Sequence, residues 1–292
     1  MMRTARNRGA RLLAIFGLAS LAAVAVGAVV CALSGVSAAS WGRNLAVWLA
    51  GGLAAAALAA AGRRVVSPGA GLTVAGLALA GLAASFFNPA QEGVHRWIDA
   101  GPLHVNVAMV VLPSLCVVLA ATERRRAVWA AALLALLLLI AQPDASQAAA
   151  LAAVTALVAV FRAPGRTARA VIVLGATVAA IAAWLRPDPL QPVAEVEEIL
   201  GLAFQLSPVV GCLALAGLAA FVAAPALVTV SAGRLRLAGA ALSLCLAVWA
   251  ITPFFGAFPV PLVGVGMSPI LGAWLGVGLL AALLTDQDRT RA

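Results

Sequence analysis

Three glutamates in the second half of the chain are the residues best placed for proton transfer. Glu195, Glu197 and Glu198 fall in the longest polar stretch, residues 184–201, just before an apolar run. A helix dipole favours negative charge at its N-terminus, which explains one or two of these acids. A third exceeds that need, and mutual repulsion would raise at least one pKa toward that of a general base. On a helix, Glu195 and Glu198 would share a face and Glu197 would point elsewhere.

A second polar stretch, residues 86–103, gathers groups suited to an anionic ligand. It contains Glu92, His95, Arg96, Trp97 and Asp99. A guanidinium binds phosphate oxygens through a planar fork of donors, and an imidazole exchanges protons near neutral pH. We therefore expect Arg96 to bind an anion and His95 to donate or shuttle a proton. The alternative is an ordinary interfacial loop, with Trp97 in the aromatic belt at the membrane surface.

A third polar stretch, residues 141–146, contains Asp144 directly after Pro143. A proline followed by an acid is typical of a helix start, because the helix dipole stabilises the carboxylate there. This structural role of Asp144 stands beside a possible role in the same site as Arg96.

These polar stretches interrupt a chain built for lipid: 64% of its residues are hydrophobic, 10% are charged, and the mean hydropathy is +1.08. A span needs roughly 20 apolar residues to cross the hydrocarbon core. We predict an all-α, polytopic integral membrane helix bundle, a single domain over residues 1–292, with about ten spans. The expected spans are residues 11–33, 45–61, 70–87, 104–121, 127–141, 147–161, 167–185, 203–228, 236–252 and 268–284. The fifth and sixth could instead form one long interrupted helix.

The arginines predict the orientation of these spans. Sixteen of the nineteen fall in alternate gaps, and only Arg43, Arg96 and Arg186 fall in the others. Cytoplasmic loops collect Arg and Lys, so both termini should be cytoplasmic, with a basic segment at 1–10 and a tail at 285–292. The expected inside set is Arg3, Arg6, Arg8, Arg11, Arg63, Arg64, Arg124, Arg125, Arg126, Arg162, Arg166, Arg169, Arg234, Arg236, Arg289 and Arg291, with the acids Glu123, Asp286 and Asp288. The other seven acids, which include Asp188, are expected on the outer face.

Composition also argues against several kinds of protein. The net charge of +9 is scattered over membrane-flanking sites, so it indicates anionic membrane lipids as partners and no nucleic acid. Cys31, Cys116, Cys212 and Cys245 lie in or beside apolar spans without CxxC spacing, so we expect no metal site or disulfide. The first apolar stretch runs past twenty residues without a clear cleavage motif and is interpreted as a retained helix.

Three motifs in order resemble the SEDS family (shape, elongation, division and sporulation), the membrane glycan polymerases of the FtsW, RodA and SpoVE type. HRWIDAGPL resembles G-x-x-RWI-x-x-GP, QPDASQA resembles QPD-x-G-T-A, and residues 258–280 resemble P-x-T-G-x-x-LPF-x-SYGGSS. The matching positions are Gly93, Arg96, Trp97, Ile98, Gly101, Pro102, Gln142, Pro143, Asp144, Ala148, Pro261, Leu262, Gly266, Ser268 and Gly278. The resemblance covers most of the chain from Phe86 onward.

The family pattern PEAHTDFIF, laid on residues 192–200, places Glu197 at the position of the family's catalytic aspartate. Glutamate keeps the carboxylate but lengthens its reach by about 1.5 Å, which matters for positioned proton transfer. The chain also departs from the family elsewhere. No GYQ segment is found, Ala108 and Met109 replace a serine and a glutamate, and SYGG is reduced to residues 264–267.

The resemblance implies a glycosyltransferase that polymerises a polyprenyl-pyrophosphate-linked disaccharide (lipid II type) at the outer face of the bacterial cytoplasmic membrane, in cell-wall synthesis, shape or division. Glu197 would deprotonate the acceptor hydroxyl, and Arg96 or Arg186 would stabilise the leaving diphosphate. Trp97, His95, Asp144, Glu195 and Ser268 would complete the substrate site. A divalent cation (Mg or Mn) could assist, although no metal-ligand set is evident, and a single-span transpeptidase (a class B penicillin-binding protein) is an expected partner.

Two other functions stay open. A catalytically inactive SEDS-like scaffold for a cell-wall or division complex would explain the departures from the motifs. A lipid or small-solute transporter would normally bury ionisable residues in mid-span, and the spans here hold almost none.

Overall fold

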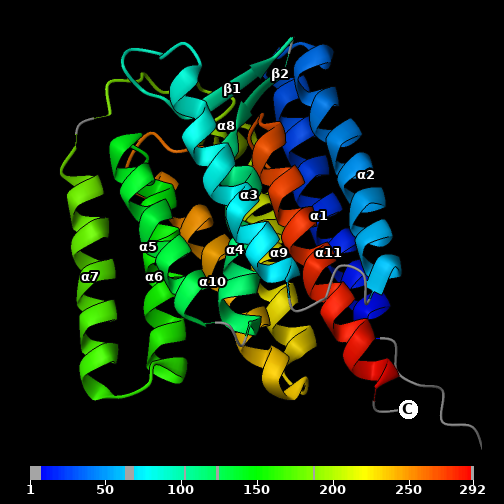
Figure 1. Cartoon of the computed structure of the whole chain (residues 1–292). Coiled ribbons are helices and arrows are strands. Elements are labelled where there is room, and N and C mark those ends of the chain that lie inside the picture. Colours follow the sequence, from blue (N-terminus) through cyan, green and yellow to red (C-terminus); the bar gives the residue numbers. More distant parts are fainter. Residues whose placement is uncertain (1–7, 63–68, 102, 123–124, 187, 291–292) are drawn as a thin grey trace, which may run out of the picture.

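The computed structural model describes residues 8–62, 69–101, 103–122, 125–186 and 188–290, which form one helix bundle with a short hairpin at one end (Figure 1). The elements are α1 (Arg8–Leu33), α2 (Ala38–Ala61), α3 (Ala70–Ala84), β1 (Trp97–Ala100), β2 (Leu103–Asn106), α4 (Val107–Ala121), α5 (Arg125–Ala141), α6 (Ala145–Arg162), α7 (Arg166–Trp184), α8 (Ile199–Leu206), α9 (Pro208–Thr229), α10 (Arg236–Ile251) and α11 (Met267–Arg289). Among the described residues, eight helices are long and apolar enough to cross a membrane. Two shorter apolar helices, Val107–Ala121 and Arg126–Ala141, correspond to the other two expected spans.

Helix α11 forms the centre of the bundle. It packs against α1, α2 and α4, and 78% of the residues in its 18-residue apolar segment are buried. Helix α7 lies at the edge of the bundle, and only 11% of the residues in its 18-residue apolar segment are buried (Figure 1). Trp274 of α11 packs edge-on against Phe16 of α1 and Trp48 of α2, with ring centroids 4.9 and 5.9 Å apart. These aromatic contacts join the first, second and last helices.

Small residues let the backbones approach closely, as the abundance of alanine and glycine suggests. A Cβ on Gly272 would lie 1.9 Å from the Met109 carbonyl oxygen of α4, and one on Gly278 would lie 2.7 Å from Ala55 Cα of α2. Helix α11 can therefore touch both neighbours only with glycine at these positions.

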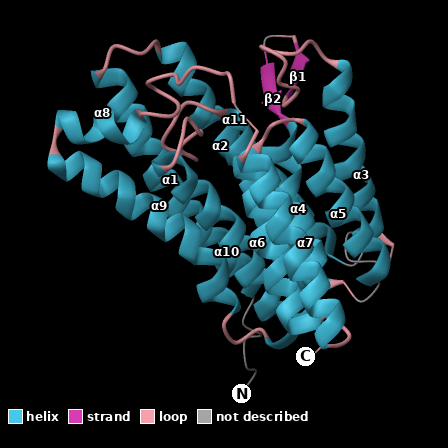
Figure 2. Ribbon diagram, turned by 90° about the vertical axis from the view of Figure 1, so that its left-hand side faces the viewer, coloured by secondary structure: helices cyan, strands magenta, loops and turns pink. Residues whose placement is uncertain are grey.

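Helix α1 begins, and helix α11 ends, on the same side of the bundle (Figure 2). Arg8 Nε donates to Asp288 Oδ1 at 2.8 Å, and Arg8 Nη2 donates to Gln287 Oε1 at 3.0 Å. The start of α1 and the end of α11 therefore lie on one face, which the arginine pattern predicts to be cytoplasmic. Some residues with an expected position or role lie outside the described residues: Arg3, Arg6, Arg63, Arg64, Pro102, Glu123, Arg124 and Arg291.

Several helix ends differ from the expected spans. Helix α1 begins at Arg8 and α11 continues to Arg289, so these helices extend into the expected basic segment at 1–10 and the expected tail at 285–292. Helix α2 begins at Ala38 instead of residue 45, because its polar first turns continue beyond the apolar window. A turn separates α5 and α6, so the single interrupted helix is excluded.

The outer side holds two elements that the hydropathy pattern did not predict. Strands β1 and β2 pair as an antiparallel hairpin, with Trp97 opposite Asn106 and Asp99 opposite His104. The expected span 203–228 is two helices: α8 ends before Ser207, whose side chain caps α9 by accepting from Val209 N, with Pro208 at the first helical position.

Candidate active site in the outer cavity

A cavity of about 390 Å³ opens at the end of the bundle that carries the hairpin. Its wall comes from the first turns of α2, α4, α6 and α11, from the hairpin, and from the loops at 190–197 and 257–266. All the outer polar stretches therefore meet in one place. Of the expected site residues, the cavity brings together Arg96, Trp97, Asp144, Glu197 and Ser268.

One face of the hairpin supplies part of the wall. Side chains alternate between the two faces of a strand, so Trp97, Asp99, His104 and Asn106 share a face in the observed register. Trp97, His104 and Asn106 line the cavity. A two-residue period within an outer loop thus decides which of its side chains face the site.

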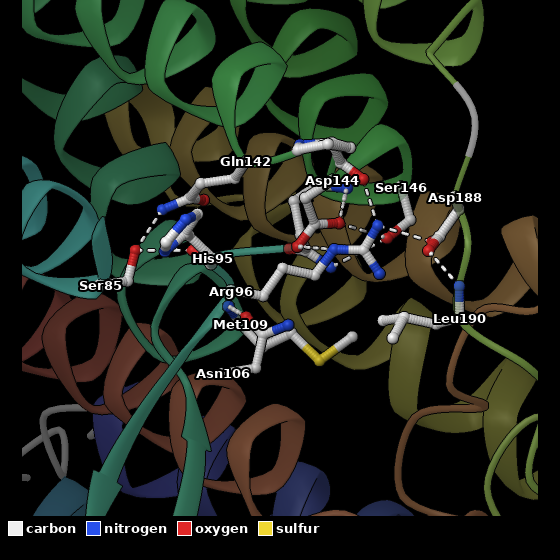
Figure 3. A network of polar contacts seen from close by, with 12 residues as sticks. Ser85, His95, Arg96, Asn106, Met109, Gln142, Asp144, Ser146, Asp188 and Leu190 are labelled. Atoms are coloured by element: carbon white, nitrogen blue, oxygen red, sulfur yellow. Dashed lines mark hydrogen bonds and ion pairs between the residues drawn. The ribbon is translucent and has the colours of Figure 1, made fainter. Parts of the chain in front are cut away.

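Arg96 lies at the centre of a buried polar network (Figure 3). Its Nη2 donates to Asp188 Oδ2 at 2.6 Å and to the carbonyl oxygen of Pro143, and its Nε lies 3.8 Å from Asp144 Oδ2. Only 7% of the Arg96 side chain and 3% of the Asp144 side chain are exposed. One guanidinium therefore contacts two carboxylates and holds the hairpin to α6 and the loop after α7.

Asp144 caps a helix, as expected, and also faces Arg96. Its Oδ1 accepts hydrogen bonds from Ser146 Oγ at 3.1 Å and from Gln147 N at 3.4 Å, which caps α6. Its Oδ2 faces Arg96 and has no hydrogen-bond partner among the described residues. The helix start and the polar network thus depend on the same carboxylate.

Glu197 lies in a tight turn at the cavity wall, and the loop at 257–266 packs against this turn. The Glu197 amide donates to the Val193 carbonyl at 2.9 Å, and Glu197 Oε2 accepts from the Val193 amide at 2.7 Å. The neighbouring Val196 carbonyl accepts from the Val260 amide at 3.1 Å. A Cβ on Gly264 would lie 2.4 Å from that same carbonyl oxygen, so glycine is required for the contact.

The three glutamates precede α8 instead of lying on it, which corrects the expected helical arrangement. Residues 194–197 form the turn, α8 begins at Ile199, and Glu198 makes no side-chain capping hydrogen bond. Burial raises the pKa of Glu197 above its ordinary value, two backbone hydrogen bonds oppose the shift, and the charges of Asp188 and Glu195 add to it. Repulsion between acids was the expected cause; desolvation is the larger one.

Arg43 is a charged cavity residue to which sequence reasoning assigned no role in the site. It lies on α2 and lines the cavity, and its Nε donates to the Ala39 carbonyl of its own helix at 2.9 Å. No carboxylate pairs with it among the described residues. The available signal was an arginine in an outer gap, where the positive-inside tendency disfavours it.

Buried amide and hydroxyl groups fix the ends of the helices around the cavity. Ser268 Oγ accepts from Asn106 N at 2.9 Å, and Asn106 Oδ1 caps α4 by accepting from Met109 N at 3.1 Å. Asn44 of α2 donates to the Gly264 carbonyl at 2.9 Å and accepts from the Gly266 amide at 3.1 Å. Ser268 is therefore a positioning residue as well as a wall residue.

Three expected site residues lie outside the cavity wall. Arg186 is exposed and donates to the Ile140 carbonyl at 2.7 Å. The His95 ring stacks on Phe86 with centroids 5.5 Å apart. Glu195 contributes its backbone carbonyl, which accepts from the Val265 amide at 2.8 Å.

Within the described residues, no three His, Cys, Asp or Glu side chains are grouped as a protein metal site requires.

The fold and the cavity together define a multi-pass membrane helix bundle with a polar site at its outer end. Comparison with solved structures identifies the fold as that of RodA, the rod shape determining protein of Thermus thermophilus. A RodA variant with one aspartate replaced by alanine superposes with a TM-score of 0.73 at 21% identity, covering 93% of this chain and 97% of RodA. Unsubstituted RodA gives a TM-score of 0.71 at 21% identity, covering 93% and 96%. The expected SEDS-like fold is thereby confirmed.

A scan of protein-family models and a sequence search of curated proteins both find no match. The similarity to RodA is therefore a similarity of fold.

Proposed function

We propose that this protein is a SEDS-type glycosyltransferase of a bacterial cytoplasmic membrane, which polymerises a polyprenyl-pyrophosphate-linked disaccharide for cell-wall synthesis. The observation that carries the proposal is Glu197, a carboxylate with a raised pKa in an outward-facing cavity of a RodA-like fold. Perturbed carboxylates in clefts are typical of general bases, because a pKa closer to the working pH improves proton transfer.

In this mechanism, Glu197 accepts the proton of the acceptor sugar hydroxyl. The hydroxyl oxygen then attacks the anomeric carbon of the donor, a glycosidic bond forms, and the bond from that carbon to the diphosphate breaks. Glu197 Oε2 accepts a hydrogen bond from the Val193 amide at 2.7 Å. This bond orients the carboxylate, and in this proposal Oε1 takes the proton.

The leaving diphosphate carries the negative charge that the site must stabilise. Arg96 faces two carboxylates already, and Arg186 lies outside the cavity wall. We assign the diphosphate to Arg43, whose guanidinium lines the cavity without a carboxylate partner among the described residues. A permanently charged planar donor set suits a diphosphate.

The substrate class also explains the position of the cavity. A polyprenyl tail remains in the hydrocarbon, so its diphosphate lies near the helix ends and its sugars lie beyond them. The cavity occupies that level, since it is lined by the first turns of α2, α4, α6 and α11 and by the hairpin. Membrane lipids and a single-span transpeptidase of the class B penicillin-binding type are the proposed partners.

The test is polymerisation by the purified protein in liposomes. Wild type, Glu197→Gln and Glu198→Gln are incubated with lipid-linked disaccharide, with and without a divalent cation, and products are resolved on a gel. Glu198 is the matched control, since it is exposed and lies outside the cavity wall. We expect glycan chains from wild type and Glu198→Gln only. Equal chains from Glu197→Gln would remove its role, and no chains from folded wild type would support the scaffold.

A further inference from the structure

The hairpin holds one imidazole in a fixed orientation at the cavity wall. His104 Nδ1 is hydrogen-bonded to Asp99 Oδ1 on the facing strand, and His104 Nε2 lies 2.7 Å from Gln91 Nε2. The imidazole also stacks on Trp97, with ring centroids 5.1 Å apart and planes 18° apart. His104, Gln91 and Trp97 all line the cavity, although 41% of the His104 side chain is exposed.

The partners of His104 define its hydrogen-bonding state. A carboxylate can only accept, so His104 Nδ1 carries the proton that Asp99 accepts. In the neutral imidazole, Nε2 is then a lone-pair acceptor, and the Gln91 amide donates to it. The second ring nitrogen thus presents an acceptor at the cavity wall, covered in this structure by a neutral amide.

An acceptor discriminates between the two polar parts of a lipid-linked sugar. A sugar hydroxyl can donate to His104 Nε2, whereas the ionised oxygens of a diphosphate can only accept. Geometry agrees with this chemistry, since the hairpin lies at the outer end of the bundle, level with the ends of α1 and α2 (Figure 1). A ligand anchored by a tail in the lipid would place its sugars at that level.

We propose that His104 is a specificity residue that accepts a hydrogen bond from a sugar hydroxyl of the lipid-linked ligand, in place of Gln91. Asp99 holds the required tautomer, and Trp97 supports the ring from one face. The proposal rests on the proposed function, because it names the part of that substrate which this wall binds. Sequence reasoning singled out Trp97 and Asp99 but assigned no role to His104 or Gln91.

The test measures equilibrium binding to protein in nanodiscs of a polyprenyl-pyrophosphate-linked disaccharide, and separately of the same polyprenyl pyrophosphate without sugar. The Glu197→Gln background prevents turnover. His104→Phe keeps a ring over Trp97 but removes the acceptor, so affinity for the glycosylated ligand should fall about tenfold. Affinity for the sugar-free ligand should stay unchanged. Gln91→Ala should keep or raise affinity for the glycosylated ligand, because it removes the competing amide.

The outcomes separate this inference from the proposed function. Absence of binding of either ligand to the parent protein would reject the proposed function. If His104→Phe binds the glycosylated ligand with unchanged affinity, the role of His104 is overturned and the proposed function is not. If His104→Phe loses affinity for both ligands equally, His104 contacts the diphosphate and its role in sugar binding is overturned. His104→Gln, which keeps an acceptor oxygen, guards against misfolding and should retain more affinity than His104→Phe.

Discussion

The buried charge network around Arg96 should dominate the stability of the outer end of the bundle. Arg96→Met keeps the length of the side chain but leaves Asp144, with 3% of its side chain exposed, and Asp188, with 24% exposed, without their cation. At about 4 Å and an effective dielectric near 20, such a pair interacts by about 4 kcal/mol. Removing one member of a buried pair costs about 3–5 kcal/mol, because the other charge stays buried.

A double-mutant cycle isolates this interaction. Asp144→Asn keeps a side-chain oxygen for the Gln147 amide but removes the charge, so it should be far less costly in the Arg96→Met background than in wild type. We expect a coupling of about 2 kcal/mol in the free energy of unfolding, measured by denaturant titration in micelles. Arg43→Gln, an exposed control without a carboxylate partner among the described residues, should change stability by less than about 0.5 kcal/mol. Additive costs would refute the argument that Arg96 neutralises Asp144.

Three further results are expected. Gly272→Ala should destabilise the bundle by about 1–3 kcal/mol, because its Cβ would meet the Met109 carbonyl oxygen, whereas Gly76→Ala on an open helix face should not; equal unfolding curves would contradict this packing. The acidic limb of the pH–rate profile should lie above the ordinary glutamate value of about 4.3, since Glu197 must be deprotonated and its pKa is raised; a limb at or below that value would exclude it as the base. Arg43→Gln should raise KM for the lipid-linked substrate about 10- to 100-fold, and an unchanged KM would exclude its diphosphate contact.

The raised pKa of Glu197 also predicts a change in stability. A carboxyl with a raised folded-state pKa stabilises the fold below its unfolded pKa, and that contribution is lost as pH rises through the folded value. At neutral pH the native state therefore carries an unfavourable charge at Glu197. Glu197→Gln should unfold at the same temperature as wild type or higher in a thermal scan at pH 7, and a clear loss of stability would show that the charged form is favoured.

Much of the architecture was predictable because lipid imposes strong constraints on sequence. The lengths of the apolar stretches predicted the helical segments. The arginines predicted that the start of α1 and the end of α11 share a face, and the contact between Arg8 and Asp288 agrees with this. The clustering of polar residues from the outer loops was also predictable in part, since these loops all lie at the same ends of the expected spans. Arg96, Asp144, Glu197 and Ser268 do meet in one cavity.

The rest depends on contacts that hydropathy does not record. Arg43 was placed in a loop because polar residues end an apolar window, although helix α2 continues through them. The pairing of Arg96 with Asp188 joins residues far apart in the chain. The break before α9 did have a local signal, Ser207 followed by Pro208, which is a typical helix start. The hairpin had only a short alternation of side chains.

The most direct test of the proposed glycosyltransferase site is a structure of Glu197→Gln with a lipid-linked disaccharide pyrophosphate bound in nanodiscs. We expect the diphosphate beside Arg43, the sugars between the hairpin and residue 197, and a sugar hydroxyl within hydrogen-bond distance of the residue 197 side chain. A headgroup bound elsewhere on the bundle, with this cavity empty, would contradict this expectation.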